Sequence, residues 1–338
     1  MKIAVLGAGA IGSLVAGYLK LKGADVTLVA RPEAVPVINK NGLMISGARG
    51  DLKVEITARE DLPENPDLII LATKTQDISP ALKANLQGIY GALILTTQNG
   101  LRSDYITSGF APKENIISSI VMFGATYSEP GEVVHNFEGA WIIGKVFGKN
   151  DERVVRLSSV LNKAFPVIIS DDLIGMKYLK VFVNANNCIA AILGVSMQEA
   201  FSDIKISRIS MAIWREGLNI VNKAGIKLTS LPDFNLERLD KLTAMPIDDA
   251  AGIFSGIMKG LSDRPLYGSI LQSIKRGKSS EIDYINGEFV ALAEQNKTDA
   301  PLNRKLVEMV HAVEKDGKFF NKEELLNATE GLVSIWSS

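Results

Sequence analysis

The chain has 338 residues, of which 46% are hydrophobic and 22% are charged, and its formal net charge at pH 7 is −1. This length suggests two domains, with cores large enough to need no disulfide staples. The near-neutral charge argues against a general nucleic-acid or membrane-surface binder. The lone cysteine, Cys188, excludes an intrachain disulfide framework and fits a reducing compartment. We therefore expect a cytoplasmic protein whose partner is a small molecule.

Histidine is scarce, because only His135 and His311 occur in the chain. We interpret each as a surface or partly buried imidazole. Their scarcity argues against Ser-His-Asp catalysis, against histidine-dependent dehydrogenase chemistry and against a histidine-rich metal site. We expect no bound metal.

The stretch from Met1 to Leu19 begins like a signal peptide, but glycines at 7, 9, 12 and 17 interrupt its apolar run. Residues 2–6 are typical of a strand buried on both faces, and a helical pattern follows to about residue 21. A second strand pattern at 25–30 ends at Arg31. We therefore favour a strand–loop–helix–strand unit over a signal peptide. No run of about 20 apolar residues predicts a transmembrane helix.

The loop between this first strand and helix reads Gly7-Ala8-Gly9-Ala10-Ile11-Gly12. In such a loop Gly7 permits a tight turn, Gly9 lets the backbone approach a pyrophosphate, and Gly12 lets the helix pack closely on the strand. The free N–H groups and dipole of the helix N-terminus would hold the phosphates. An acid after the second strand would favour NAD, whereas Arg31 suits the 2′-phosphate of NADP and weakens an S-adenosylmethionine alternative. Arg31 could also be merely solvated.

Two further buried strands are predicted at 68–73 and 92–97, and polar residues follow both of them. Lys74 comes directly after the first and Asn99 after the second. Ligands of open parallel sheets bind beyond the carboxyl ends of the strands, so Lys74 and Asn99 are placed to line one crevice. The alternatives are a solvated loop lysine and an asparagine that belongs to a turn before Gly100.

The rest of the chain divides into a strand-rich part and a helical part. Short strands over 116–147 indicate the far, antiparallel-containing edge of the sheet, and 167–170 indicates its last strand. We therefore predict an α/β protein with a doubly wound Rossmann-type dinucleotide-binding domain at 1–170 and an all-α domain at 171–338. Helices of the second domain are predicted at 199–224, 235–243, 247–260, 283–296, 301–315 and 322–333. The segment 228–264 is the least constrained.

A polar stripe marks the start of this second domain. Read as one helix, residues 178–188 place Lys180, Asn184 and Asn187 within about 60° around the axis. Burying an amine and two amides without partners would cost several kcal/mol, so this stripe predicts a polar cavity or a ligand. We interpret Lys180 as a catalytic acid. Further along, Ser269 and Glu281, taken alone, are most simply helix caps.

Together these segments resemble the ketopantoate reductases (2-dehydropantoate 2-reductases) over nearly the whole chain. The specific part of the resemblance is Lys180-x-x-x-Asn184 followed about a hundred residues later by the run that starts at Glu281. The matching segments are the glycine loop, Arg31, Ala72-Thr73-Lys74, Gln98-Asn99-Gly100, Tyr178-Leu179-Lys180, Ser269-Ile270-Leu271-Gln272, Glu281-Ile282-Asp283-Tyr284-Ile285-Asn286-Gly287 and Pro301-Leu302-Asn303.

The resemblance implies that the first domain binds NADPH and that the helical domain closes over 2-dehydropantoate. Hydride would pass to the C2 ketone, giving pantoate for pantothenate (vitamin B5) synthesis, and Lys180 would protonate the developing alkoxide. The implied substrate-binding residues are Asn99, Asn184 and Ser269. The implied cofactor-binding residues are Gly7, Ala8, Gly9, Ala10, Ile11, Gly12, Arg31, Lys74, Asn99, Ala125 and Glu281.

The chain departs from the family pattern near the end of the polar stripe. The family usually has asparagine and proline where this chain has Cys188 and Ile189. Asn187, about 20° from Lys180 around a continuous helix, could substitute as a substrate ligand. Because relatives with this scaffold reduce other branched or aromatic 2-oxo acids, a different 2-oxo or 3-hydroxy acid remains an alternative. A dinucleotide sensor without turnover is another, and the sequence leaves a homodimer open.

Overall fold

The computed structural model describes residues 1–262 and 264–336. The chain divides into two compact units, Met1–Ile174 (unit 1) and Gly175–Ser338 (unit 2). The expected functional division at 170/171 stays a prediction. Asp263, within the 228–264 segment, and Ser337 and Ser338, at the end of the expected second domain, lie outside the described residues.

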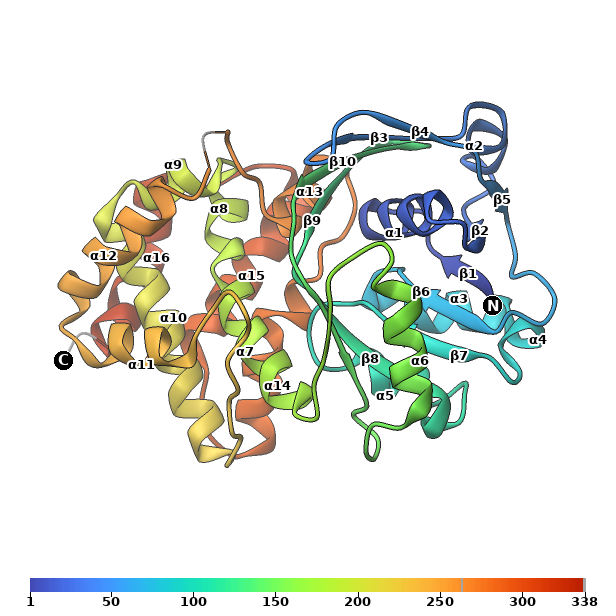
Figure 1. Ribbon diagram of the computed structural model, residues 1–338. Coiled ribbons are helices and arrows are strands. Elements are labelled where there is room, and N and C mark those ends of the chain that lie inside the picture. Colours follow the sequence, from blue (N-terminus) through green and yellow to red (C-terminus); the bar gives the residue numbers. More distant parts are fainter. Residues whose placement is uncertain (263, 337–338) are drawn as a thin grey trace. The chain divides into compact units, whose positions relative to one another are not determined.

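Unit 1 contains an eight-stranded sheet with the order β12-β11-β8-β7-β6-β1-β2-β5 (Figure 1). All neighbouring strands are parallel except β8 and β11. The chain runs outward from β1 in both directions, so the sheet has its switch point between β1 and β6, as in doubly wound folds. The strands are β1 (Lys2–Leu6), β2 (Asp25–Val29), β5 (Thr57–Arg59), β6 (Leu68–Leu71), β7 (Leu93–Thr96), β8 (Ile116–Val121), β11 (Trp141–Gly144) and β12 (Val167–Ile169).

Both faces of this sheet are covered, which explains the continuous apolar runs of its strands. Ile3 and Val5 enter one hydrophobic cluster together with Leu14 of α1. Ala4 and Leu6 point the other way, into a second cluster with Leu82 of α3. The doubly wound arrangement is confirmed. The helices of unit 1 are α1 (Ala10–Leu21), α2 (Val35–Asn41), η1 (Thr75–Asp77), α3 (Ile78–Ala84), α4 (Leu86–Ile89), α5 (Ser103–Thr107), η2 (Lys113–Asn115) and α6 (Glu152–Leu161).

A second sheet of unit 1, with the order β4-β3-β10-β9, corrects the expectation for residues 116–147. Only β8 and β11 of that stretch join the main sheet. The two strands between them, β9 and β10, pair with each other, and β10 pairs with β3, whose other neighbour is β4. This sheet was not predicted from the sequence, because the β3–β10 pairing joins segments far apart in the chain. The strands are β3 (Leu43–Gly47), β4 (Leu52–Val54), β9 (Gly124–Glu129) and β10 (Glu132–Phe137).

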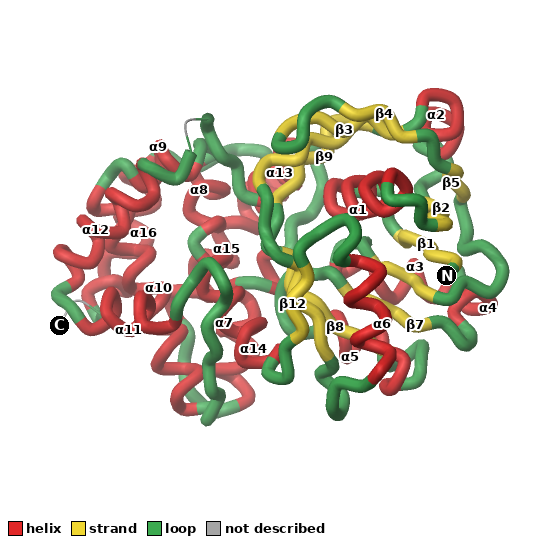
Figure 2. The backbone as a smooth tube through the Cα atoms, viewed as in Figure 1, coloured by secondary structure: helices red, strands yellow, loops and turns green. Residues whose placement is uncertain are grey.

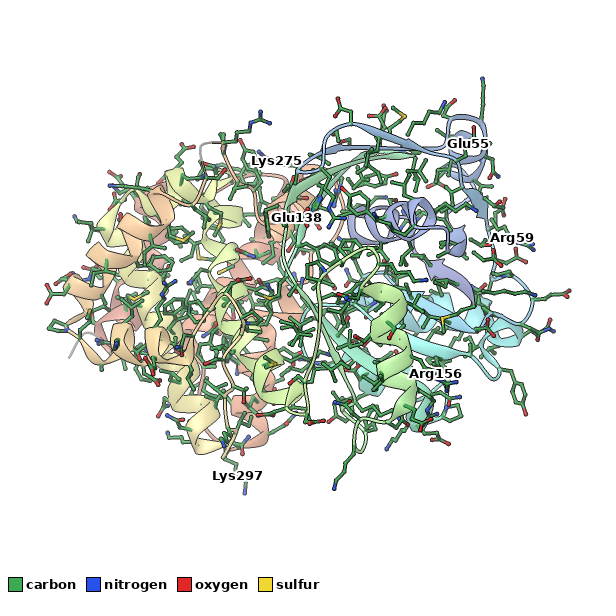
Figure 3. All side chains as sticks on the ribbon, viewed as in Figure 1. Glu55, Arg59, Glu138, Arg156, Lys275 and Lys297 are labelled. Atoms are coloured by element: carbon green, nitrogen blue, oxygen red, sulfur yellow. The ribbon has the colours of Figure 1, made fainter. Side chains whose placement is uncertain are left out.

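The second sheet buries a polar cluster against α1. His135 of β10 is fully buried rather than exposed or partly buried as expected, and its Nδ1 lies 3.0 Å from the Tyr18 hydroxyl. Burial lowers the pKa of His135. The guanidinium of Arg49 lies over the Tyr18 ring and pairs through two hydrogen bonds with Glu138, which Figure 3 labels. These contacts tie the β3–β4 turn to α1 and β10.

Unit 2 is helical, as predicted (Figure 2). None of the helices in its described part, nor of those in unit 1, is long and apolar enough to cross a membrane. The helices are α7 (Leu173–Ala185), α8 (Asn187–Leu193), α9 (Met197–Phe201), α10 (Ile204–Lys223), α11 (Leu236–Ala244), α12 (Ile247–Lys259), α13 (Ser269–Lys275), η3 (Ile282–Tyr284), α14 (Asn286–Gln295), α15 (Pro301–Asp316) and α16 (Lys322–Ser334).

Two predictions for unit 2 need correction, and one helix, α13, was not predicted. The expected helix at 199–224 is two helices, because Asp203 caps α10 by accepting a hydrogen bond from the Lys205 N–H. The stretch 178–188 is also two helices, since α7 ends at Ala185 and α8 begins at Asn187. Lys180 and Asn184 therefore share one helix, but Asn187 belongs to the next.

The helix α7 is anchored in the core of unit 2 by aromatic residues. Trp214 of α10 donates a hydrogen bond of 2.8 Å from its indole nitrogen to the Phe182 carbonyl oxygen of α7. The Phe182 ring packs edge-on against Phe289 of α14, with 4.8 Å between the ring centroids. Two residues before Phe182 in the chain, Lys180 is thus held on a fixed helix.

Candidate active site

In unit 1, the carboxyl ends of the central strands are tied together by backbone hydrogen bonds. The Gly7 N–H donates to the Val29 carbonyl at the end of β2, and the Ala72 N–H donates to the Leu6 carbonyl at the end of β1. This edge, next to the switch point, is where doubly wound sheets bind ligands. The glycine loop, Arg31, Lys74 and Asn99 all follow these strand ends.

The glycine loop meets the steric demands of a dinucleotide. A Cβ at Gly7 would lie 2.8 Å from the Thr73 nitrogen, and one at Gly12 would lie 1.8 Å from the Gly7 carbonyl oxygen. A Cβ at Gly9 would meet no atom of the described residues within 4 Å. Close packing at the outer glycines and open space at the middle one is the arrangement that admits a pyrophosphate. Ala8 and Ile11 border the hydrophobic cluster beneath, and Ala10 starts α1, whose first-turn N–H groups face outward from the helix end.

A glutamine links the two neighbouring loops that carry Lys74 and Asn99. The buried Gln98 amide donates hydrogen bonds to the carbonyl oxygens of Leu71 and Thr73, at 2.8 and 2.9 Å. This fixes the turn after β7 against the turn after β6. Lys74 and Asn99, both partly buried, are thereby brought to the same edge of the sheet.

The remaining predicted cofactor residues of unit 1 lie on separate elements. Arg31 is exposed beyond β2, and within the part of the chain that the structure describes its guanidinium makes no hydrogen bond or ion pair. Ala125 lies on β9 of the second sheet and borders the same hydrophobic cluster as Ala8. The hydroxyl of Thr73, beside Gly7, is buried without a hydrogen-bond partner among the described residues.

In unit 2, Lys180 and Asn184 are four residues apart on α7 and therefore face the same side of this helix. Burial lowers the pKa of the Lys180 ammonium to about 8, and the negative charge of Asp233 opposes that shift. A lysine with a pKa near the working pH is suited to donate and accept protons. Lys180 therefore has the electrostatics of a general acid.

Asp233, which lies in the 228–264 segment, was not predicted to belong to the site. A short turn presents it, because Leu231 and Phe234 exchange two backbone hydrogen bonds of 3.0 and 3.2 Å. The Phe234 ring packs against Trp214, whose indole is hydrogen-bonded to α7. The turn is therefore fixed beside the helix that carries Lys180. Only the fold could reveal this neighbour, since a Pro-Asp pair in a loop has no special sequence signal.

The other predicted substrate residues of unit 2 cluster around α8 and α13. A Cβ at Gly268 would lie 3.1 Å from the Asn187 side chain, so Asn187 packs against the turn that leads into Ser269. Ser269 is exposed and is the first residue of α13, whose cap position is Gly268, so the capping interpretation of Ser269 is wrong. The structure thus brings Asn187 and Ser269 together.

Cys188 turns away from that cluster and into the core. It is fully buried, and burial raises the pKa of its thiol to about 12, against a hydrogen bond from Asn286. Asn286 is in turn hydrogen-bonded to Asn303, which donates to the buried carboxylate of Glu216. The departure from the family pattern at position 188 therefore lies in an interior polar network, and Ile189 beside it is equally buried.

Glu281, the last predicted cofactor residue, stands at the start of η3. It occupies the cap position of this short helix, where the capping interpretation places it, but its side chain forms no capping hydrogen bond. Its neighbours in the chain are tied to α15, since Glu314 accepts a hydrogen bond from the Ser280 N–H and His311 contacts Asp283.

Comparisons with known proteins agree with this geometry. Residues 3–148 match the family model "Ketopantoate reductase PanE/ApbA", and residues 172–314 match that of its C-terminal part. The chain is 34% identical to a 2-dehydropantoate 2-reductase of Pyrococcus horikoshii, over 94% of this chain and 99% of that protein.

Solved structures of the same architecture are also similar. A D-mandelate dehydrogenase, solved with NADH and anilino(oxo)acetate, has a TM-score of 0.82 and 25% identity, covering 94% of this chain and 99% of that one. A PanE/ApbA family ketopantoate reductase of Ralstonia eutropha JMP134 has a TM-score of 0.78 and 25% identity, with the same coverage.

Proposed function

The chain belongs to the ketopantoate reductase family, and from this premise we propose that it reduces 2-dehydropantoate to pantoate with NADPH, in pantothenate biosynthesis. The family uses NAD(P)H; the choice of NADPH is part of the proposal. The observation that supports this proposal is that one chain has both a glycine loop that fits a dinucleotide and a lysine, Lys180, whose pKa is lowered to about 8. Its single, buried cysteine suits the cytoplasm, which we propose as its location.

In this proposal the nicotinamide, when bound, supplies the hydride that reduces the C2 carbonyl, and the residues of this chain hold and orient the cofactor. N–H groups at the start of α1 bind the pyrophosphate beside Gly9, and the Arg31 guanidinium pairs with the 2′-phosphate. Lys74, Asn99 and Ala125 contact the cofactor beyond the ends of β6, β7 and on β9. Glu281 of unit 2 binds its ribose.

Lys180 supplies the proton. With a pKa of about 8, its ammonium is protonated in about nine of ten molecules at pH 7, which suits reduction. The ammonium donates its proton to the alkoxide oxygen that develops at C2. Asn99, Asn184, Asn187 and Ser269 bind the substrate oxygens and orient the carbonyl, so that reaction is favoured by positioning as well as by acid catalysis.

A second candidate is the reduction of another 2-oxo acid. Two observations favour it: the high TM-score with D-mandelate dehydrogenase, and Cys188 in place of the asparagine usual in the family. Because Cys188 is buried in the core, any change of substrate would come from Asn187 beside it rather than from the thiol.

The test is an assay of a panel of 2-oxo acids with NADPH and with NADH, on the wild type and on Arg31→Ala. We expect the highest kcat/KM for 2-dehydropantoate with NADPH. The substitution should raise the KM for NADPH by about 10- to 100-fold, the value of a charged hydrogen bond, and change that for NADH little. If simpler or aromatic 2-oxo acids react as well as 2-dehydropantoate, the second candidate replaces the first. An unchanged ratio of the two cofactor KM values would refute the choice of NADPH.

A further inference from the structure

His311 stands between two carboxylates in unit 2. Its Nε2 lies 3.0 Å from Oδ1 of Asp283, which belongs to η3, and its Nδ1 lies 3.1 Å from Oε2 of Glu314, one turn along α15. A carboxylate can only accept, so each contact is a hydrogen bond only if that nitrogen carries a proton. A neutral imidazole has one N–H, whereas an imidazolium has two. A protonated His311 can therefore form both hydrogen bonds at once, whereas a neutral His311 can form only one of them.

The two carboxylates brace a short segment that contains Glu281. At its start, the Ser280 N–H donates a hydrogen bond of 2.6 Å to the second oxygen of Glu314. At its other end, Asp283 is held by His311. Between them, Ile282 is fully buried. Glu281 thus lies on a backbone that is attached to α15 on both sides, although its own side chain is only partly buried.

We propose that protonated His311 is a positioning residue, which holds the segment Ser280–Asp283 on α15 and thereby sets where the Glu281 carboxylate meets the cofactor. This inference rests on the proposed function, in which Glu281 binds the ribose of NADPH. His311 touches neither substrate nor cofactor in this account and acts through Asp283 and Glu314. Loss of its proton leaves one N–H for two carboxylates, so one brace is lost and two negative charges face a neutral ring.

The charges around His311 set the pH range in which this happens. Burial lowers its pKa, but the hydrogen bonds and charges of Asp283 and Glu314 outweigh burial, so the pKa is raised above its ordinary value of 6.5. Among the described residues of the elements packed on α15, namely α8, α10, α14, α16 and η3, Asp283 is the one group whose charge acts on His311. The brace is therefore complete below about pH 6.5 and is lost as the pH rises through the raised pKa.

The experiment measures the dissociation constant of NADPH against pH by fluorescence, for the full-length wild type and three variants. The wild type should bind several-fold more weakly above the pKa of His311 than below it. His311→Gln, which cannot be protonated, should bind weakly at every pH and lose the pH dependence. Asp283→Asn, a milder change, should move the midpoint of the curve to lower pH. Lys315→Gln, an exposed charge on the same helix, is the matched control and should reproduce the wild-type curve.

Nuclear magnetic resonance gives an independent reading, because the chain has only two histidines and His311→Gln assigns their signals. The His311 signal should titrate above 6.5, with the midpoint of the wild-type binding curve. If it titrates at or below 6.5, or if His311→Gln keeps the wild-type curve, the positioning role is refuted while the proposed function stands. If NADPH does not bind to the wild type or the control at any pH, the cofactor assignment fails, and this inference fails with it.

Discussion

The glycine loop of unit 1 and the Lys180 helix of unit 2 both fit a polar ligand, but they are built from different groups. The loop relies on the backbone: Gly7 packs against the residues that follow β6, Gly12 packs against Gly7, and Gly9 leaves space beside the N–H groups of α1. The helix α7 relies on side chains, whose charges are set by burial and by a turn far along the chain. A backbone site depends on shape, whereas a side-chain site depends on its electrical surroundings.

The largest effect is expected from replacing Lys180, because the two sites differ most in their dependence on a single side chain. Replacing Lys180 by alanine should lower kcat by roughly 10²–10⁴, the usual value of general acid catalysis. The affinity for NADPH, measured by fluorescence titration, should change little, because the glycine loop is untouched. Lys180→Arg keeps a positive charge but is a poor proton donor, so it should resemble the alanine variant in kcat. If Lys180→Ala lowered the affinity for NADPH as much as it lowered kcat, the division between cofactor binding by the glycine loop and proton donation by Lys180 would be contradicted.

The glycine loop is tested by two variants, in which alanine replaces either Gly12 or Gly9. An alanine at Gly12 would put its Cβ on the Gly7 carbonyl oxygen, so Gly12→Ala should lower the free energy of unfolding by about 3 kcal/mol or more. Gly9 has an extended backbone and open space around it, so Gly9→Ala should fold normally and weaken NADPH binding by about tenfold or more. Thermal unfolding and NADPH titration measure both. If Gly12→Ala and Gly9→Ala lowered the free energy of unfolding equally, the close packing at Gly12 and the open space at Gly9 would be contradicted.

The smallest effect is expected at Asp233. Its charge opposes the burial that lowers the pKa of Lys180, so Asp233→Asn should lower that pKa further, below about 8. The alkaline fall in the rate of reduction should then begin at a lower pH, with a shift that is small because an exposed carboxylate is screened by water. Asp240→Asn, an exposed aspartate on α11, is the control. An identical pH–rate profile for the wild type and both variants would remove Asp233 from the site.

The sequence predicted what depends on neighbouring residues and missed what depends on distant ones. The buried runs of β1, β2, β6 and β7, and most helices of unit 2, have local periodicities, and the structure confirms them. The β3–β10 pairing joins segments that are separated in the sequence by the whole central part of unit 1. No local sequence pattern therefore predicts it.

The residues around the candidate site show the same difference between local and distant relationships. Lys180 could be singled out because an amine on an apolar helix is unusual. Asp233 and His311 could not, because their importance comes from what the fold sets beside them. The break between α7 and α8 at Asn186 could not be predicted either, because the residues on both sides of it favour a helix.

The turn that carries Asp233 lies outside the helices, and it is held to the core by the buried Leu231 side chain and by the Phe234 ring, which packs on Trp214. Its exposed residues, Pro232 and Asp233, can therefore vary in sequence without disturbing the core that holds α7. Over evolution, such a turn lets the acidity of the lysine be adjusted to a new substrate or a new cellular pH while the helix that bears it stays the same.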